Sequence, residues 1–155
     1  MVSRVEIQAG SKVNACLELY TKQTSMPSIC VIGESDPFIA QLLQRFAEKT
    51  GLHVERGVMS QDVLDLIRRV NPAVVILDAE LPGSLLGWEA IRILRAETKT
   101  STLRVISCSW LNKAKATRLM GPLAGHLQKP DLYYEDFIAA VQNAGIMVNG
   151  LKDMN

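Results

Sequence analysis

Carboxylates, a hydroxyl and an ammonium group follow the short apolar segments of this sequence, where the chain leaves each segment. They are Glu34, Ser35, Asp36, Asp78, Ser109 and Lys129. Asp78 is the most informative, because it ends the aliphatic run Ala73–Leu77. Burying a carboxylate there costs several kcal/mol unless the group is paired with a cation or binds a metal. These residue types therefore indicate a polar site in which carboxylates meet a metal ion or a lysine.

Short β-branched segments alternate with amphipathic ones from residue 28 onward, which is typical of βα units around a parallel sheet. Strands are predicted at residues 28–32, 52–56, 73–78, 103–109 and 125–127. Helices are predicted at residues 37–50, 60–71, 88–97, 111–120 and 134–144. The third strand is apolar at successive positions, as a central strand covered on both faces must be. Since parallel sheets bind ligands beyond the carboxyl ends of their strands, we expect the polar residues to share one edge.

Two of these helices have a candidate capping residue at their start. Asp36 directly precedes Pro37, so we interpret it as a helix cap in preference to a metal ligand. Ser60 is predicted to cap the helix that ends at Asn71, before Pro72.

Length and composition favour one globular domain and exclude several classes of protein. The chain has 155 residues, 48% of them hydrophobic, and a net charge of +1, which argues against a dedicated nucleic-acid or acidic-membrane binder. Three widely spaced cysteines without a CxxC pair indicate reduced thiols in a cytoplasmic protein. No apolar run is long enough to cross a bilayer. Residues 1–27 are expected to be an extension, either frayed or with a short amphipathic helix at 12–22, and residues 146–155 a tail.

Residues 28–145 resemble the receiver domain of two-component response regulators. The phosphoacceptor motif of that family, Asp-x-x-(Leu/Met)-Pro after an apolar strand, is matched by residues 78–82. Its Lys-Pro pair is matched by Lys129 and Pro130, and its Ser/Thr after the fourth strand by Ser109. The resemblance implies a flavodoxin-like five-stranded parallel sheet of order 2-1-3-4-5, with helices on both faces.

The resemblance also implies a function for these residues. A single-domain receiver of this kind is a signalling module and not an enzyme, and its aspartate, here Asp78, accepts a phosphoryl group from a sensor histidine kinase or phosphotransfer protein. Mg²⁺ would be held by Glu34, Asp78 and the backbone carbonyl of Glu80, with Asp36 as a weaker candidate. Lys129 and Ser109 would each bind a phosphoryl oxygen. The added charge would then bias a bistable loop and helix that signal to a downstream protein.

Three positions depart from the family pattern. Ser35 stands where a second consecutive acid is usual, so Mg²⁺ should bind weakly. Trp110 follows the switch hydroxyl, where a small residue is usual, and its indole could roof the site. The loop at residues 83–87 is expected to be one residue longer than the usual form.

Two other functions remain open from the sequence. Lys129 and Asp78 could form a structural ion pair in a pseudo-receiver, which binds partners without phosphotransfer. A Mg²⁺-dependent phosphohydrolase would need a second aspartate two residues after the nucleophile, but Glu80 stands there. The pseudo-receiver is therefore the main alternative.

The resemblance to receivers implies that output leaves through the face formed by residues 110–145. Basic residues on this face stand opposite acidic ones: Lys113, Lys115 and Arg118 against Glu135 and Asp136. Such a face could pair with a second copy or dock another protein.

Overall fold

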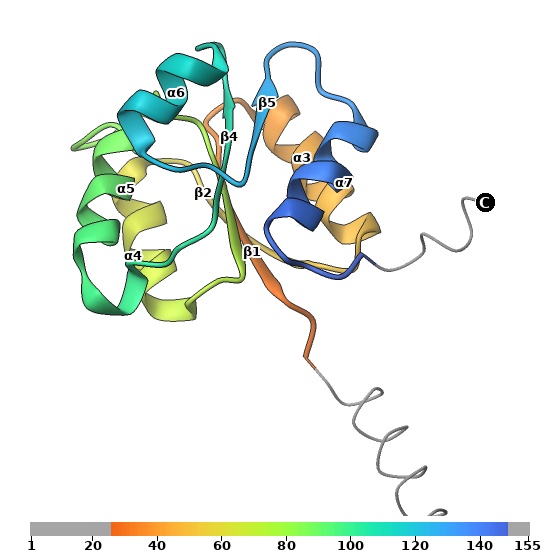
Figure 1. The fold of residues 1–155 in the computed structure, drawn as a ribbon, viewed down its shortest axis with the longest axis horizontal. Helices are drawn as coiled ribbons and strands as arrows, with labels where there is room; N and C mark the ends of the chain where they lie inside the picture. Colours follow the sequence, from red (N-terminus) through yellow and green to blue (C-terminus); the bar gives the residue numbers. More distant parts are fainter. Residues whose placement is uncertain (1–25, 149–155) are drawn as a thin grey trace, which may run out of the picture.

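The structure, a computed structural model, describes residues 26–148 and is built on a five-stranded parallel sheet (Figure 1). The strand order is β2-β1-β3-β4-β5, with every neighbouring pair parallel. The strands are β1 (Ile29–Gly33), β2 (His53–Gly57), β3 (Val74–Leu77), β4 (Val105–Ser109) and β5 (Gly125–Gln128). The flavodoxin-like fold predicted from the sequence is confirmed.

Helices cover both faces of the sheet, as a parallel sheet with crossover connections requires. They are α3 (Pro37–Lys49), α4 (Ser60–Val70), α5 (Gly87–Ala96), α6 (Lys113–Met120) and α7 (Tyr134–Asn143), with a short 3₁₀ turn, η1 (Thr98–Thr100). In Figure 1, α3 and α7 lie on one side of the sheet, and α4, α5 and α6 lie on the other. None of the helices within residues 26–148 is long and apolar enough to span a bilayer.

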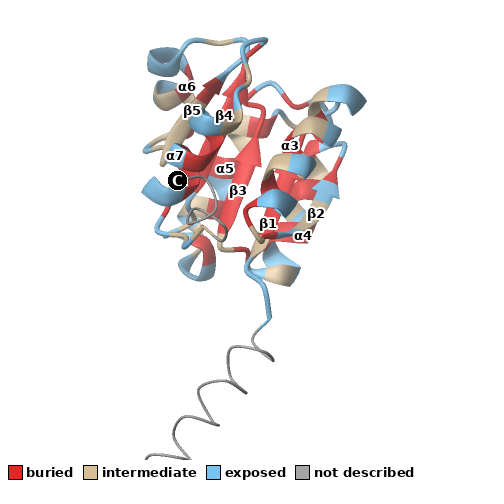
Figure 2. Cartoon of the chain, turned by 90° about the vertical axis from the view of Figure 1, so that its right-hand side faces the viewer, coloured by how far each residue is buried: buried red, intermediate tan, exposed pale blue. Residues whose placement is uncertain are grey.

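The central strands are buried because both of their faces meet helices (Figure 2). Every residue of β3 and β4 is buried, whereas the edge strand β2 exposes His53 and Arg56. The continuous apolar pattern of β3 therefore reflects its central place between β1 and β4.

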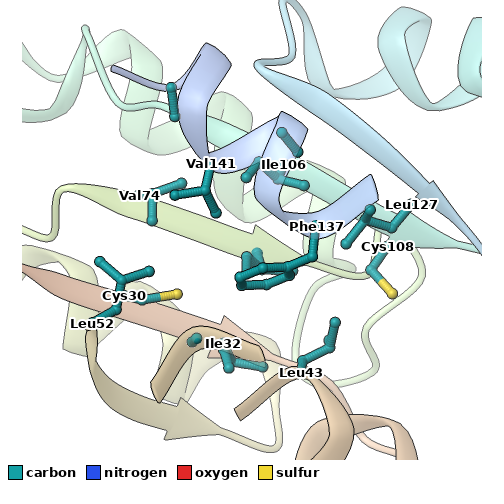
Figure 3. Packing of buried hydrophobic residues seen from close by; sticks show 14 residues of the cluster. Cys30, Ile32, Leu43, Leu52, Val74, Ile106, Cys108, Leu127, Phe137 and Val141 are labelled. Carbon is teal, nitrogen blue, oxygen red and sulfur yellow. The ribbon is translucent and has the colours of Figure 1, made fainter. Parts of the chain in front are cut away.

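Two apolar layers fill the space between the sheet and its helices. In the layer under α3 and α7, the ring of Phe137 is fully buried and packs among side chains from both helices and the sheet (Figure 3). The other layer joins the sheet to α4 and α5, through residues such as Val63, Ile67 and Ile91. These two layers hold the strand ends in register, and so hold the polar residues that follow them.

Several sequence predictions need correction at element ends. Ser60 is not a helix cap: Met59 is the N-cap of α4, and the Ser60 hydroxyl donates to the backbone carbonyl of Leu85. That loop carbonyl competes for the hydroxyl, and it could not be foreseen from the local sequence. The fourth strand begins at Val105 instead of residue 103, and the following helix begins at Lys113 instead of residue 111. The helix predicted at residues 12–22 lies outside the described residues.

Candidate functional site

Glu34 and Asp78 lie next to each other because β1 and β3 are adjacent and in register. Gly33 pairs with Leu77 across the two strands, and the Asp78 amide donates to the Gly33 carbonyl at 3.0 Å. Each carboxylate thus follows its strand by one residue. Both residues are buried, Glu34 with 3% and Asp78 with 7% exposure, so burial demands a counter-charge for them.

Lys129 supplies that counter-charge from the end of β5. Its ammonium Nζ lies 2.6 Å from Glu34 Oε1 and 2.8 Å from Asp78 Oδ2, and its side chain is only 2% exposed. The Lys129 amide donates to the carbonyl of Ser109 at 2.9 Å, which ties the end of β5 to the end of β4. The structure therefore brings together three of the residues that the sequence singled out, as a buried ion cluster.

The remaining carboxylate oxygens are held by backbone amides. Glu34 Oε2 accepts from the Asp36 amide at 3.0 Å, and Asp78 Oδ1 accepts from the Glu80 amide at 2.9 Å. These bonds orient both carboxylates toward Lys129. The cluster has two acids and one amine, so its formal charges do not cancel and it favours a further cation.

The pKa of Lys129 reflects the competition between burial and its partners. Burial alone lowers the pKa, but the hydrogen bonds and charges of Asp78 and Glu34 outweigh that effect and raise it above the ordinary 10.5. Lys129 is thus protonated throughout the neutral range and acts as a fixed positive charge.

Ser109 ends β4 and is completely buried. Its hydroxyl oxygen accepts a hydrogen bond from the Leu111 amide at 3.1 Å. Among the hydrogen bonds formed within residues 26–148, none joins this hydroxyl to Asp78 or Lys129. The sequence thus placed Ser109 at the correct strand end, but in this structure its hydroxyl is used inside its own loop.

The oxygen donors at the cluster fit a Mg²⁺ ion bound through few protein ligands. In the described part of the chain there is no group of three His, Cys, Asp or Glu side chains that could hold a metal. Ser35 is exposed, and Asp36 is the N-cap of α3, with its side chain accepting from the Phe38 and Ile39 amides. What remains is Glu34, Asp78 and nearby backbone carbonyls, which suits an ion that keeps several of its waters.

The loop after β3 is fastened to the start of α4 beside the cluster. The Pro82 carbonyl accepts from the Ser60 amide at 2.9 Å, and the Ser84 amide donates to Gln61 Oε1 at 3.0 Å. At the end of this loop, α5 begins so close to Asp78 that a Cβ on Gly87 would lie 2.2 Å from the Asp78 carbonyl oxygen. Only glycine permits that approach.

Trp110 is 60% exposed, so much of its surface is in contact with solvent. Glu80 and residues 82–84, which follow Asp78 in the same loop, are also exposed.

A buried aspartate, a buried serine and a buried lysine thus lie at the ends of three adjacent strands of a five-stranded parallel sheet. The family model for the response regulator receiver domain matches residues 29–140. The chain belongs to this family. Receiver domains are generally signalling modules without enzymatic activity, they typically bind Mg²⁺ at the phosphorylation site, and they interact with sensor kinases or phosphotransfer proteins.

Solved structures with this fold come from several bacteria. A putative response regulator from Chloroflexus aurantiacus is 23% identical, with a TM-score of 0.69 over 77% of this chain and 98% of that chain. The chemotaxis response regulator CheY4 of Vibrio cholerae is 17% identical, with a TM-score of 0.68 over 77% and 99%. A search of curated proteins found no match. At these identities the structures support the fold alone.

Sequence reasoning missed a set of polar contacts on β4 and β5. Ser107, His126 and Gln128 form hydrogen bonds in series that end on the backbone carbonyls of Ser109 and Trp110. The alternation of Gly125, His126, Leu127 and Gln128 marks His126 and Gln128 as residues on the same side of the strand. That periodicity was the available signal, but it does not show which groups they meet.

Proposed function

We propose that this receiver accepts a phosphoryl group on Asp78 from the phosphohistidine of a sensor kinase or phosphotransfer protein. The observation that carries the proposal is the ion cluster, in which Asp78 Oδ2 lies 2.8 Å from the Lys129 ammonium at the carboxyl edge of the sheet. A buried carboxylate held in one orientation by an amine and an amide is positioned to act as a nucleophile.

The reaction exchanges one bond to phosphorus for another. An Asp78 carboxylate oxygen forms a bond to the phosphorus atom, while the bond from phosphorus to the donor imidazole nitrogen breaks and the nitrogen keeps the electron pair. Mg²⁺ held by Glu34, Asp78 and the Glu80 carbonyl would draw charge from the phosphoryl oxygens. Lys129 stabilises the same oxygens as a point charge, because its ammonium already lies between both carboxylates.

Ser109 and its loop convert the new charge into a signal. The hydroxyl leaves the Leu111 amide and donates to a phosphoryl oxygen, which moves the loop between β4 and α6. The moved loop changes the surface that meets a downstream protein.

A direct test is to incubate the full chain with a small acyl phosphate and Mg²⁺ and to measure its intact mass. The expected result is an increase by one phosphoryl group that disappears when Mg²⁺ is chelated. Absence of the adduct with acyl phosphate, and also with histidine-phosphorylated donors, would contradict the proposal.

The metal site gives a second prediction. Ser35 is exposed and neutral beside Glu34, so Ser35→Asp adds a hard oxygen ligand and should tighten Mg²⁺ binding by about tenfold. Isothermal titration of both proteins with MgCl₂ measures the difference. Ser84→Asp, on another exposed loop position, is the matched control and should leave the affinity at the wild-type value. Equal affinity in all three proteins would show that Ser35 does not limit the site.

A pseudo-receiver is the second candidate, and one observation favours it. Three of the four oxygens of Glu34 and Asp78 accept a hydrogen bond from Lys129 or an amide, and Glu34 Oε1 lies 2.6 Å from the Lys129 ammonium, so the cluster is stable as a structural ion pair. In that case the domain binds its partner with unchanged affinity in the presence and absence of phosphodonor, and the mass experiment above gives no adduct.

We propose that the face formed by α6, β5 and α7 carries the output, either to a second copy or to another protein. Lys113, Lys115 and Arg118 are exposed on α6, and Glu135 and Asp136 are exposed on α7. Reversing Lys113 and Lys115 to glutamate should weaken self-association or partner recovery severalfold without unfolding the domain, because exposed ion pairs contribute little to stability.

Sedimentation equilibrium and partner pull-down measure this effect. The control reverses two exposed cations on other helices, Arg45 and Arg69, and so changes the net charge equally. If both double variants behave alike, the output face lies elsewhere.

A further inference from the structure

Gln128 fastens the loop that follows β4. Its side-chain Nε2 donates to the carbonyl of Trp110 at 3.1 Å and to the carbonyl of Ser109 at 3.2 Å. The carbonyl of Lys129 lies 3.3 Å from the same nitrogen and shares its hydrogens. Gln128, the last residue of β5, thus forms hydrogen bonds with two consecutive backbone carbonyls, at the end of β4 and in the loop that follows it.

These contacts determine which way the side-chain amide of Gln128 points and which nitrogen of His126 carries the hydrogen that faces it. Three carbonyls can only accept, so the amide nitrogen of Gln128 must face them and its Oε1 must face His126. The distance from His126 Nε2 to Gln128 Oε1 is 2.9 Å, which places the imidazole hydrogen on Nε2. Nδ1 of the same ring lies within hydrogen-bond distance of the hydroxyl of Ser107.

The hydrogen bonds that link Ser107, His126 and Gln128 begin at a buried residue of the sheet. Ser107 is completely buried in the middle of β4 and pairs with His126 across the two strands. We call Ser107, His126 and Gln128 the polar clamp. It runs along one side of the β4–β5 pair, from the core to the loop at residues 109–112.

The loop that the clamp holds contains the Ser109 hydroxyl. That hydroxyl accepts from the Leu111 amide, and Asn112 caps α6 by accepting from the Lys115 amide at 2.8 Å. A hydroxyl that turns toward a group on Asp78 gives up the Leu111 amide, and that amide belongs to the loop whose carbonyls at residues 109 and 110 accept from Gln128. Gln128 holds both of those carbonyls.

We propose that Gln128 is a positioning residue for Ser109: it holds the loop in the arrangement of this structure and opposes the movement of the hydroxyl toward a phosphoryl group on Asp78. The inference about phosphorylation rests on the proposed function, whereas the inference about the loop does not. Loss of the clamp should free the loop and make phosphorylation faster.

The first experiment measures the loop without any phosphodonor. Gln128→Met keeps the length of the side chain but removes its amide, and Gln142→Met, at an exposed position of α7, is the matched control. Hydrogen exchange of the Leu111 amide should become roughly 2- to 10-fold faster in Gln128→Met, the factor expected for the loss of one hydrogen bond. Exchange in β3 should stay at the wild-type rate. An unchanged Leu111 rate, or equal acceleration everywhere, would overturn the proposal.

The second experiment asks whether Gln128 acts through Ser109. The rate of phosphoryl uptake from acyl phosphate is measured for wild type, Gln128→Met, Ser109→Ala and the double variant. The expected result is a rate about threefold higher in Gln128→Met alone, and no effect of that substitution when Ser109 is alanine. Equal effects in both backgrounds would show a merely structural role and overturn the proposal. If wild type takes up no phosphoryl group, the proposed function fails. The hydrogen-exchange rate of the Leu111 amide then tests by itself whether Gln128 holds the loop.

Discussion

Replacing Asp78 with asparagine is expected to abolish phosphoryl uptake while leaving the domain folded. The amide is uncharged and is not a nucleophile toward phosphorus, so the reaction loses its acceptor atom. An asparagine oxygen can still accept from the Glu80 amide, and Lys129 keeps its contact with Glu34. The free energy of unfolding should therefore change by about 2 kcal/mol at most.

Intact mass after acyl phosphate treatment measures the uptake, and urea denaturation measures the stability. Asp136→Asn is the matched control, because Asp136 is exposed on α7 and lies outside the ion cluster. It should take up one phosphoryl group, as wild type does. Uptake by Asp78→Asn would mean that another side chain is the acceptor, and the assignment of Asp78 would then be wrong.

The second large effect is expected at Lys129. Lys129→Met keeps most of the side-chain volume but leaves Glu34 and Asp78, with 3% and 7% exposure, without their cation. Breaking a buried ion pair on one side costs about 3–5 kcal/mol, which is a large part of the roughly 5–15 kcal/mol that stabilises a domain. Uptake should also be lost, because the phosphoryl oxygens lose their positive partner.

Two comparisons separate these effects. Lys113→Met, at an exposed position, should leave both the stability and the uptake at wild-type values. Glu34→Gln should cost less stability than Lys129→Met, because it leaves one carboxylate with one ammonium in the cluster. Urea midpoints that fall equally for Lys129→Met and Lys113→Met would show that the cluster adds nothing to stability.

The pH dependence of stability follows from the raised pKa of Lys129. A group whose pKa is higher in the folded state than in the unfolded state stabilises the fold fully below its unfolded pKa. The contribution is lost as pH rises through the folded pKa, which lies above 10.5. The stabilisation that Lys129 contributes to the wild type should thus be constant near neutrality and be lost only in strong alkali, which urea denaturation of the wild type at increasing pH measures.

The sheet and its order were predictable from the sequence because their signals are local or carried by family motifs. Consecutive aliphatic residues from Ala73 to Leu77 marked a strand covered on both faces, and this strand is β3, flanked by β1 and β4. Asp36 before Pro37 marked a helix start, which α3 confirms. A capping bond joins residues two or three positions apart, so the sequence alone contains both partners.

The candidate site was predictable in its members but not in its contacts. Parallel strands bring Glu34, Asp78, Ser109 and Lys129 to one edge, as expected. That the Lys129 ammonium lies within 2.8 Å of both carboxylates, while the Ser109 hydroxyl accepts from the Leu111 amide, depends on strand register and side-chain rotamers. Neither quantity is written in the local pattern of residue types.

The sequence by itself determined the elements, the core and the set of candidate site residues, since periodicity, capping and strand-end position act over a few neighbouring residues. Only the tertiary structure decided the hydrogen-bond partners of Ser60 and Gln128 and the exposure of Trp110. The Ser60 hydroxyl donates to the carbonyl of Leu85 instead of capping α4. Trp110 is 60% exposed. The Gln128 side chain donates to the carbonyls of Ser109 and Trp110. The physical reason is that these contacts join residues far apart in the chain, whose approach is set by how the sheet and helices pack together.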